Sequence, residues 1–169
     1  NLLLIICTVF TINSSTTFGQ NNALDFDNVN DFVEVNNASS LVSATTNMSM
    51  SCWVYPRNTS AGWPDFDGIL GFRNDINADF YLLQLNSTDI EARFRNSTGG
   101  IFTVVQPGLV LNTWQHLVLT YNGTTLSVYL NGVLGVSIPA NGNLINNNVD
   151  FTLGKVNFSS GDFFFDGSI

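Results

Sequence analysis

Apolar residues recur at every second position along most of the chain, and no segment shows the spacing of an amphipathic helix. The clearest alternation runs from Met48 to Tyr55, with Met50, Cys52 and Val54 on the same face as Met48. Such alternation is typical of strands with one buried face. The sequence therefore predicts an all-β chain with almost no helix after residue 20.

Shorter apolar or alternating segments, bounded by Gly, Asn and Pro, predict the remaining strands. These strands are expected at Leu24–Phe26, Phe32–Val35, Gly68–Arg73, Asp79–Leu85, Ile90–Arg95, Ile101–Val105, Gln115–Tyr121, Thr125–Asn131, Val133–Ile138, Phe151–Leu153 and Phe163–Ile169. Asn122-Gly123-Thr124 gives the strongest hairpin signal, because Asn and Gly tolerate positive φ. Short strands at regular intervals with such turns predict a sandwich or a barrel.

The charge composition excludes several classes of partner. The chain has 5 Lys plus Arg against 13 Asp plus Glu, a formal net charge of -8. Nucleic-acid binding needs a basic surface, and so does docking on anionic lipid, so neither partner is expected. Disorder is excluded as well, because 44% hydrophobic and 12% aromatic residues can form a core.

The first residues are typical of a secretory signal. The apolar run Leu2–Ile12 is too short for a membrane-spanning helix, which needs about 20 residues. Thr17 and Gly19 could precede a cleavage site, which assigns residues 1–19 to an N-terminally truncated signal peptide. The alternatives are that the run forms a first strand, or that Cys7 carries a lipid anchor. We expect a secreted or cell-surface protein with no membrane insertion after signal removal.

Several segments, read in order, resemble the laminin-G-like, concanavalin A-like jelly-roll family of bacterial secreted proteins. The matching segments are Ala23–Val35, Met48–Pro56, Asn112–Val133, Phe151–Lys155 and Phe164–Ile169. The resemblance implies a two-sheet antiparallel jelly-roll sandwich over residues 20–169. Members usually continue with an acidic pair and an apolar strand, so the resemblance also implies that the final strand is missing here.

The resemblance implies a non-catalytic module of a larger extracellular protein that binds a glycan or a cell-surface protein. One alternative is a module appended to a hydrolase encoded downstream, and another is a structural spacer in a long adhesin. Glycosidases of this fold carry a strand of closely spaced carboxylates, and this chain has none. His116 and Cys52 are interpreted as structural residues, the thiol as buried and inert.

A loop around Trp63 is the predicted ligand site. Trp63 lies between Gly62 and Pro64, and Asp65 and Asp67 follow it, so the ring could stack on a sugar while the carboxylates accept its hydroxyl groups. The alternatives are a core role for the ring and a solvated loop for the carboxylates. Trp53, Tyr55 and Trp114 are expected in the core, although Trp53 and Tyr55 could instead line a concave sheet.

Calcium is the metal that the resemblance implies, because related jelly rolls hold it where the first and last strands meet. Asp27, Asp31 and Asp166 occupy the acidic positions of these segments. Calcium prefers six to eight oxygen ligands, which carboxylates and carbonyls supply. The alternative is that the three residues only cap turns.

Overall fold

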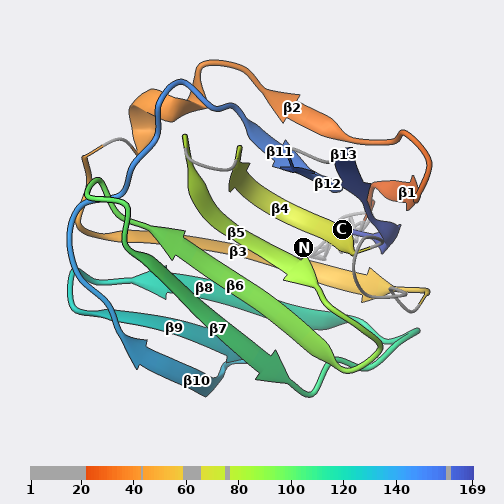
Figure 1. The fold of residues 1–169 in the computed structure, drawn as a ribbon. Helices are drawn as coiled ribbons and strands as arrows, with labels where there is room; N and C mark the ends of the chain where they lie inside the picture. The colour runs from red at the N-terminus through yellow and green to blue at the C-terminus, as the bar shows by residue number, and fades with distance from the viewer. Residues whose placement is uncertain (1–21, 43, 59–65, 75–76, 159–160) are drawn as a thin grey trace, which may run out of the picture.

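The computed structural model describes residues 22–42, 44–58, 66–74, 77–158 and 161–169. Two six-stranded antiparallel sheets pack face to face (Figure 1), which confirms the predicted jelly-roll sandwich. The single helical element of the described residues is the short 3-10 turn η1 (Ala38–Leu41), as expected from the missing helical periodicity. No helix in these ranges has the length and apolar character needed to cross a bilayer.

Sheet 1 contains the two ends of the domain side by side. Its strands, in spatial order, are β1 (Asp25–Asp27), β14 (Asp166–Ser168), β3 (Met48–Pro56), β8 (Gln115–Tyr121), β9 (Thr125–Leu130) and β10 (Val133–Pro139). In its register, Asp25 lies opposite Ser168, and Trp53 lies opposite His116. Residues far apart in the sequence therefore share one surface of this sheet.

Sheet 2 faces sheet 1, and a small hairpin lies against its outer side. Its strands are β2 (Val33–Val35), β11 (Phe151–Leu153), β4 (Asp67–Arg73), β5 (Asp79–Gln84), β6 (Asp89–Arg95) and β7 (Ile101–Pro107). The hairpin pairs β12 (Lys155–Phe158) with β13 (Gly161–Phe164). Sequence analysis did not predict β12 as a strand.

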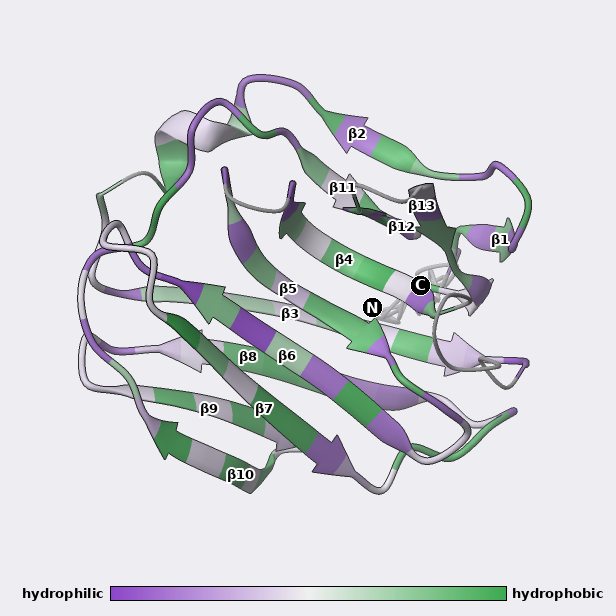
Figure 2. Cartoon of the chain, in the orientation of Figure 1, coloured by the Kyte–Doolittle hydropathy of each residue, from purple (hydrophilic) through white to green (hydrophobic). Residues whose placement is uncertain are grey.

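The main core fills the space between the two sheets. Alternation places one side of a strand in this core, as the colours along β6 in Figure 2 illustrate. In β6, Ile90, Ala92 and Phe94 are buried, whereas the residues between them are only half-buried. A second apolar cluster lies on the outer side of sheet 2. It contains Tyr81, Leu83, Val156 and Phe163. β4 and β5 are consequently buried on both faces.

The segment Phe163–Ile169 was predicted as one strand, and it divides into two. Phe163 belongs to β13 and to the second cluster, whereas Phe165 is completely buried in the main core. The Phe165 carbonyl accepts a hydrogen bond from the Asn28 amide, and its own amide donates to Gly154. The chain thus crosses from the outer hairpin to sheet 1 at Phe165.

Candidate functional site

The outer face of sheet 1 carries an aromatic surface. Because Cys52 and Val54 point into the core, Trp53 and Tyr55 point outward. The Trp53 ring lies 5.2 Å from the His116 ring, and the Tyr55 ring lies 5.5 Å from the Trp114 ring, centroid to centroid. Trp53 is 58% exposed and Trp114 is 44% exposed.

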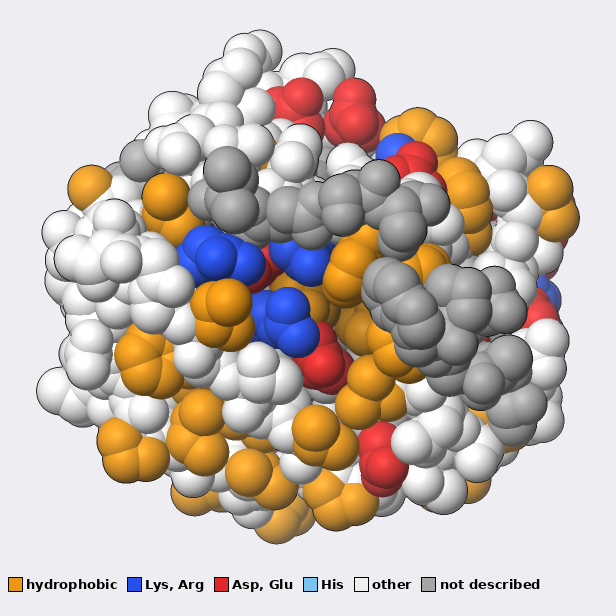
Figure 3. Space-filling model, viewed as in Figure 1, with side chains coloured by type: hydrophobic (Ala, Val, Ile, Leu, Met, Phe, Trp, Pro, Cys, Tyr) orange, Lys and Arg blue, Asp and Glu red, His pale blue; other side chains and the backbone are white. Residues whose placement is uncertain are grey.

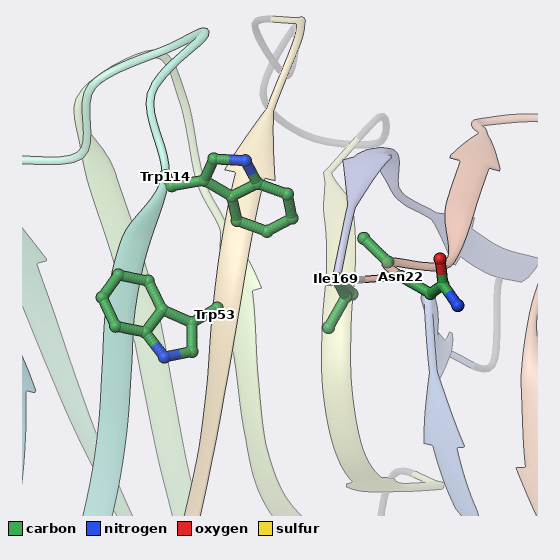
Figure 4. A pocket seen from close by; sticks show the side chains of 5 residues that line it. Asn22, Trp53, Trp114 and Ile169 are labelled. Atoms are coloured by element: carbon green, nitrogen blue, oxygen red, sulfur yellow. The ribbon is translucent and has the colours of Figure 1, made fainter. Parts of the chain in front are cut away.

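The two tryptophans border a hollow of about 470 Å³. Figure 4 shows both indole rings on one side of the hollow, with Asn22 and Ile169 on the other. Ala23 also lines it. The hollow offers flat apolar rings, which can stack on a sugar or an apolar side chain, but the Asn22 side chain is its main polar contribution.

The core assignment of Trp53 and Trp114 was wrong. At the start of β8, the side chain that points inward is that of Gln115. Its Oε1 accepts a hydrogen bond from the Val110 amide at 2.7 Å, and its Nε2 donates one to the Gly108 carbonyl at 3.2 Å. A buried polar side chain is tolerated when its hydrogen bonds are made. Gln115 therefore takes the place expected of an apolar residue, and Trp114 is turned outward.

The outer face of sheet 2 carries a buried ion-pair network across β4, β5 and β6. Arg73 Nη1 lies 2.5 Å from Asp79 Oδ1, and Arg95 Nε lies 2.8 Å from Asp79 Oδ2. Asp79 is fully buried and Arg73 almost so. Burial raises the pKa of Asp79 more than the guanidinium groups of Arg73 and Arg95 lower it.

A second group of polar side chains continues this surface along the same strands. The Tyr81 hydroxyl donates to Glu91 Oε1 at 2.5 Å, and Arg93 Nη2 lies 3.1 Å from the same oxygen. Burial, together with the Glu91 carboxylate, raises the pKa of Tyr81, so its hydroxyl stays protonated and donates. The Arg73 guanidinium lies 3.9 Å above the Phe158 ring.

These residues form one patch, which we call the arginine face: Arg73, Asp79, Tyr81, Glu91, Arg93 and Arg95. Figure 3 shows blue and red side chains gathered in a hollow at the centre of this side of the molecule, over the area of β4–β6. Sequence analysis missed it. The signal was present as charged residues alternating with apolar ones in Ile90–Arg95, but alternation alone does not show which neighbouring strands join them.

Two of the three predicted ligand residues, Trp63 and Asp65, lie outside the described residues. Asp67 is described, and the expectation of a solvated loop was wrong for it. It is the first residue of β4 and only 3% exposed. Neighbouring Gly68 lies against the backbone of Val156 and Phe163, which shows how closely the outer hairpin packs on this end of the strand.

The three predicted calcium ligands do not come together as a metal site. Asp27 lies opposite Asp166 in the register, but the Asp166 carboxylate contacts Arg57 Nε at 3.0 Å, and Asp27 Oδ1 accepts the Val29 amide at 2.9 Å. The described part of the chain holds no group of three His, Cys, Asp or Glu arranged for a metal ion. The calcium site of Asp27, Asp31 and Asp166 stays a prediction.

The remaining candidates for chemistry have structural surroundings. Cys52 packs against the main core, and burial raises the pKa of its thiol to about 12, so the reactive thiolate is scarce at neutral pH. This confirms the expected inert thiol. His116 is half-buried in β8, where its ring lies beside Trp53 and its amide donates to Asn131 Oδ1 at 2.8 Å.

Comparison with known proteins gives a family match and several structures of similar fold. The family described as "Concanavalin A-like lectin/glucanases superfamily" matches residues 26–169. The CBM40 domain of the Ruminococcus gnavus IT-sialidase, solved with alpha2,3 sialyllactose, is similar in structure, with a TM-score of 0.63, 14% identity and 88% coverage of both chains. A search of curated proteins finds no match.

Two other solved structures are similar over a part of their length. NanB sialidase from Streptococcus pneumoniae has a TM-score of 0.65 and 18% identity, over 87% of this chain and 24% of its own. The binding domain of Paraclostridial Mosquitocidal Protein 1 has a TM-score of 0.64 and 16% identity, over 85% of this chain and 38% of its own. The chain spans about two fifths of the length of this binding domain and of two further toxin binding-domain structures, and at these identities the likeness shows the fold.

Proposed function

Because the chain belongs to the concanavalin A-like lectin/glucanase superfamily, we propose that it is a non-catalytic carbohydrate-binding module. Its ligand surface is the arginine face of sheet 2. The observation that carries this proposal is the set of convergent polar groups in the hollow shown in Figure 3, on rigid neighbouring strands. Sugar sites need such groups because each hydroxyl requires a partner in place of water. We further propose that the module is secreted and serves a larger extracellular protein.

Glu91 and Arg93 are the side chains best placed to take part in binding. Tyr81 and Arg93 both contact Oε1 of the Glu91 carboxylate, so Oε2 is the oxygen that would accept a sugar hydroxyl. Arg93 is 23% exposed and offers further guanidinium hydrogens, and Thr103 lies opposite it on β7 and is exposed. Their strands fix their spacing, so little conformational entropy is lost on binding.

The carboxylates of this face are engaged in ion pairs, which supports binding over hydrolysis. A glycosidase needs one carboxyl that donates a proton and a second that acts as nucleophile or base. Asp79 is enclosed by two guanidinium groups and has no exposed surface, so it is out of reach of a glycosidic oxygen. Glu91 is held by Tyr81 and Arg93.

The first experiment tests whether the chain binds glycans and on which face. The full chain is applied to an array of neutral and acidic glycans, and its best ligand is titrated against two variants. Glu91→Gln removes one charged acceptor from the arginine face and should weaken binding about tenfold or more, the usual effect of losing a hydrogen bond to a charged group. The double variant Trp53→Ala, Trp114→Ala changes only the aromatic surface of sheet 1 and should bind normally.

The alternative surface remains open to the same experiment. If the double variant loses binding while Glu91→Gln keeps it, the ligand lies on the aromatic surface, whose two rings face the hollow. Absence of binding to every glycan of the array would overturn the proposed function. Thermal melts of each variant show whether a loss of binding reflects unfolding.

A further inference from the structure

Positive charge is concentrated on the arginine face of an otherwise acidic chain. The chain has only 5 Lys and Arg residues and a net charge of -8, yet Arg73, Arg93 and Arg95 all lie on this face. They meet two carboxylates, those of Asp79 and Glu91. Three of the five cationic side chains of the chain are therefore gathered on one face, although the molecule as a whole is strongly negative.

Arg93 is the guanidinium with unused donors. Within the part of the chain that the structure describes, its one ion pair is the contact of Nη2 with Glu91, at 3.1 Å. Its Nε is buried and has no hydrogen-bond partner among the described residues. A buried donor without a partner destabilises the folded state, and more so on a charged group. Because Nε is shielded from solvent, a ligand can reach this guanidinium only through the exposed part of the side chain, which is 23% accessible.

The neighbours of Arg93 hold its position without taking these donors. Its guanidinium lies 5.7 Å from the centre of the Tyr81 ring, which faces it from the adjacent strand β5. Stacking of this kind fixes the plane of the guanidinium while leaving its edge open to a planar anion. Arg95, two residues along β6, brings a second cationic group to the same face.

We propose that the glycan bound by this module carries a carboxylate, as uronic and sialic acids do, and that Arg93 binds that carboxylate. The inference rests on the proposed function, since it names the class of sugar that the same face takes. A carboxylate matches the fork of a guanidinium with two parallel hydrogen bonds, which gives both strength and orientation. A neutral sugar offers no anion to the exposed part of the Arg93 guanidinium.

The central comparison in the test is between an acidic sugar and its methyl ester, which differ only at the carboxylate. The full chain is titrated by NMR or calorimetry with 3′-sialyllactose, its methyl ester, lactose and trigalacturonate. The acids should bind at least about tenfold more tightly than the ester and lactose. Trigalacturonate against 3′-sialyllactose distinguishes a uronic from a sialic source. Arg93→Gln should reduce binding of the acid to the level of its ester, and Arg93→Lys should recover only a part because it lacks the fork.

Arg57→Gln is the matched control, since Arg57 is a partly exposed arginine on sheet 1 that contacts Asp25 and Asp166. It should leave the preference for acids unchanged. If the ester and lactose bind as well as the acids, or if Arg93→Gln weakens all four equally, the inference is wrong while glycan binding on this face stands. If Arg93→Gln has no effect on acid binding, the carboxylate is bound elsewhere. If no ligand binds here or on the array, the proposed function itself fails.

Discussion

At the scale of single residues, Arg57 links the two ends of the domain. Its guanidinium reaches Asp25 Oδ1 at 2.6 Å, the Phe26 carbonyl at 2.6 Å and Asp166 Oδ1 at 3.0 Å. One side chain, directly after the end of β3, thus contacts both β1 and β14, which are separated by most of the sequence. The Arg57 hydrogen bond, helped by the Ser168 hydroxyl, lowers the pKa of Asp25 below its ordinary value of 3.8.

The pH dependence of stability follows from this pKa. A carboxyl whose pKa is lower in the folded state stabilises the fold above its unfolded pKa, and this contribution disappears as the pH falls through the folded value. Asp25→Asn should therefore lower the melting temperature slightly at pH 7, and the difference from the unsubstituted chain should vanish in the acid range below about pH 3.8. Melting curves between pH 2 and 7 measure it. A difference that grows toward low pH would contradict this assignment. Asp27→Asn is the control, because Asp27 is an exposed neighbour for which the described residues show no ion pair.

Individual site residues were predicted less well than the strands that carry them. Asp67 and Trp114 were placed by residue type, as a loop carboxylate and a core ring, and both placements were wrong. In each case the neighbouring sequence decides: the hairpin packed on Gly68 buries the start of β4, and Gln115 takes the inward position of β8. Such effects depend on contacts between distant segments, which a single sequence does not show.

At the scale of elements, period-two alternation predicted nearly every strand of both sheets, because each has one face in the shared core. It failed where both faces are buried or where the chain changes layers. The strand β12 was missed because its alternating run, Lys155–Phe158, is only four residues long. Its Lys155 is buried beside Asp162 and the Phe32 ring, where a polar residue would be expected to face solvent. Phe163–Ile169 was predicted as one strand because its aromatic residues follow one another. In the structure Phe163 packs in the second cluster and Phe165 in the main core.

Gly71 in β4 allows Tyr81 of the arginine face to pack closely against that strand. It lies in β4 opposite Tyr81 with a φ of +142°, and a Cβ there would meet the Phe80 carbonyl oxygen at 2.4 Å and the Tyr81 Cβ at 2.6 Å. Tyr81 can therefore approach β4 only because residue 71 has no side chain. The same close approach positions Tyr81 against Glu91.

Gly71→Ala should lower the free energy of unfolding by about 1–3 kcal/mol, the usual cost of forcing an extra group into a packed site. It should also weaken glycan binding, because Tyr81 must shift. Gly99→Ala is the matched control: its φ of +88° is also unfavourable for alanine, but no atom lies within 4 Å of the added Cβ. Chemical denaturation of both variants gives the comparison. Equal destabilisation would mean that backbone strain, and not the contact with Tyr81, determines the effect.

At the scale of the whole molecule, the net charge acts on a ligand at long range, whereas the arginine face acts on it only at short range. The fold gathers three arginines within one face, whereas the net charge of -8 belongs to the entire chain. An anionic sugar approaching from solution first meets the negative field of the whole molecule. Only at short range does it meet the guanidinium groups of the arginine face.

Salt separates these two effects. In water, eight unit charges at about 20 Å repel an anion by about 1–2 kcal/mol. At about 0.01 M salt the screening length is about 30 Å, so most of this repulsion persists, whereas at about 0.15 M it is about 8 Å and mainly the contact with Arg93 remains. The affinity for 3′-sialyllactose should therefore rise several-fold between these concentrations, opposite to the usual behaviour of ion pairs. Its methyl ester should show no such change. A steady decline of acid affinity with salt would mean that the local cluster dominates at every distance.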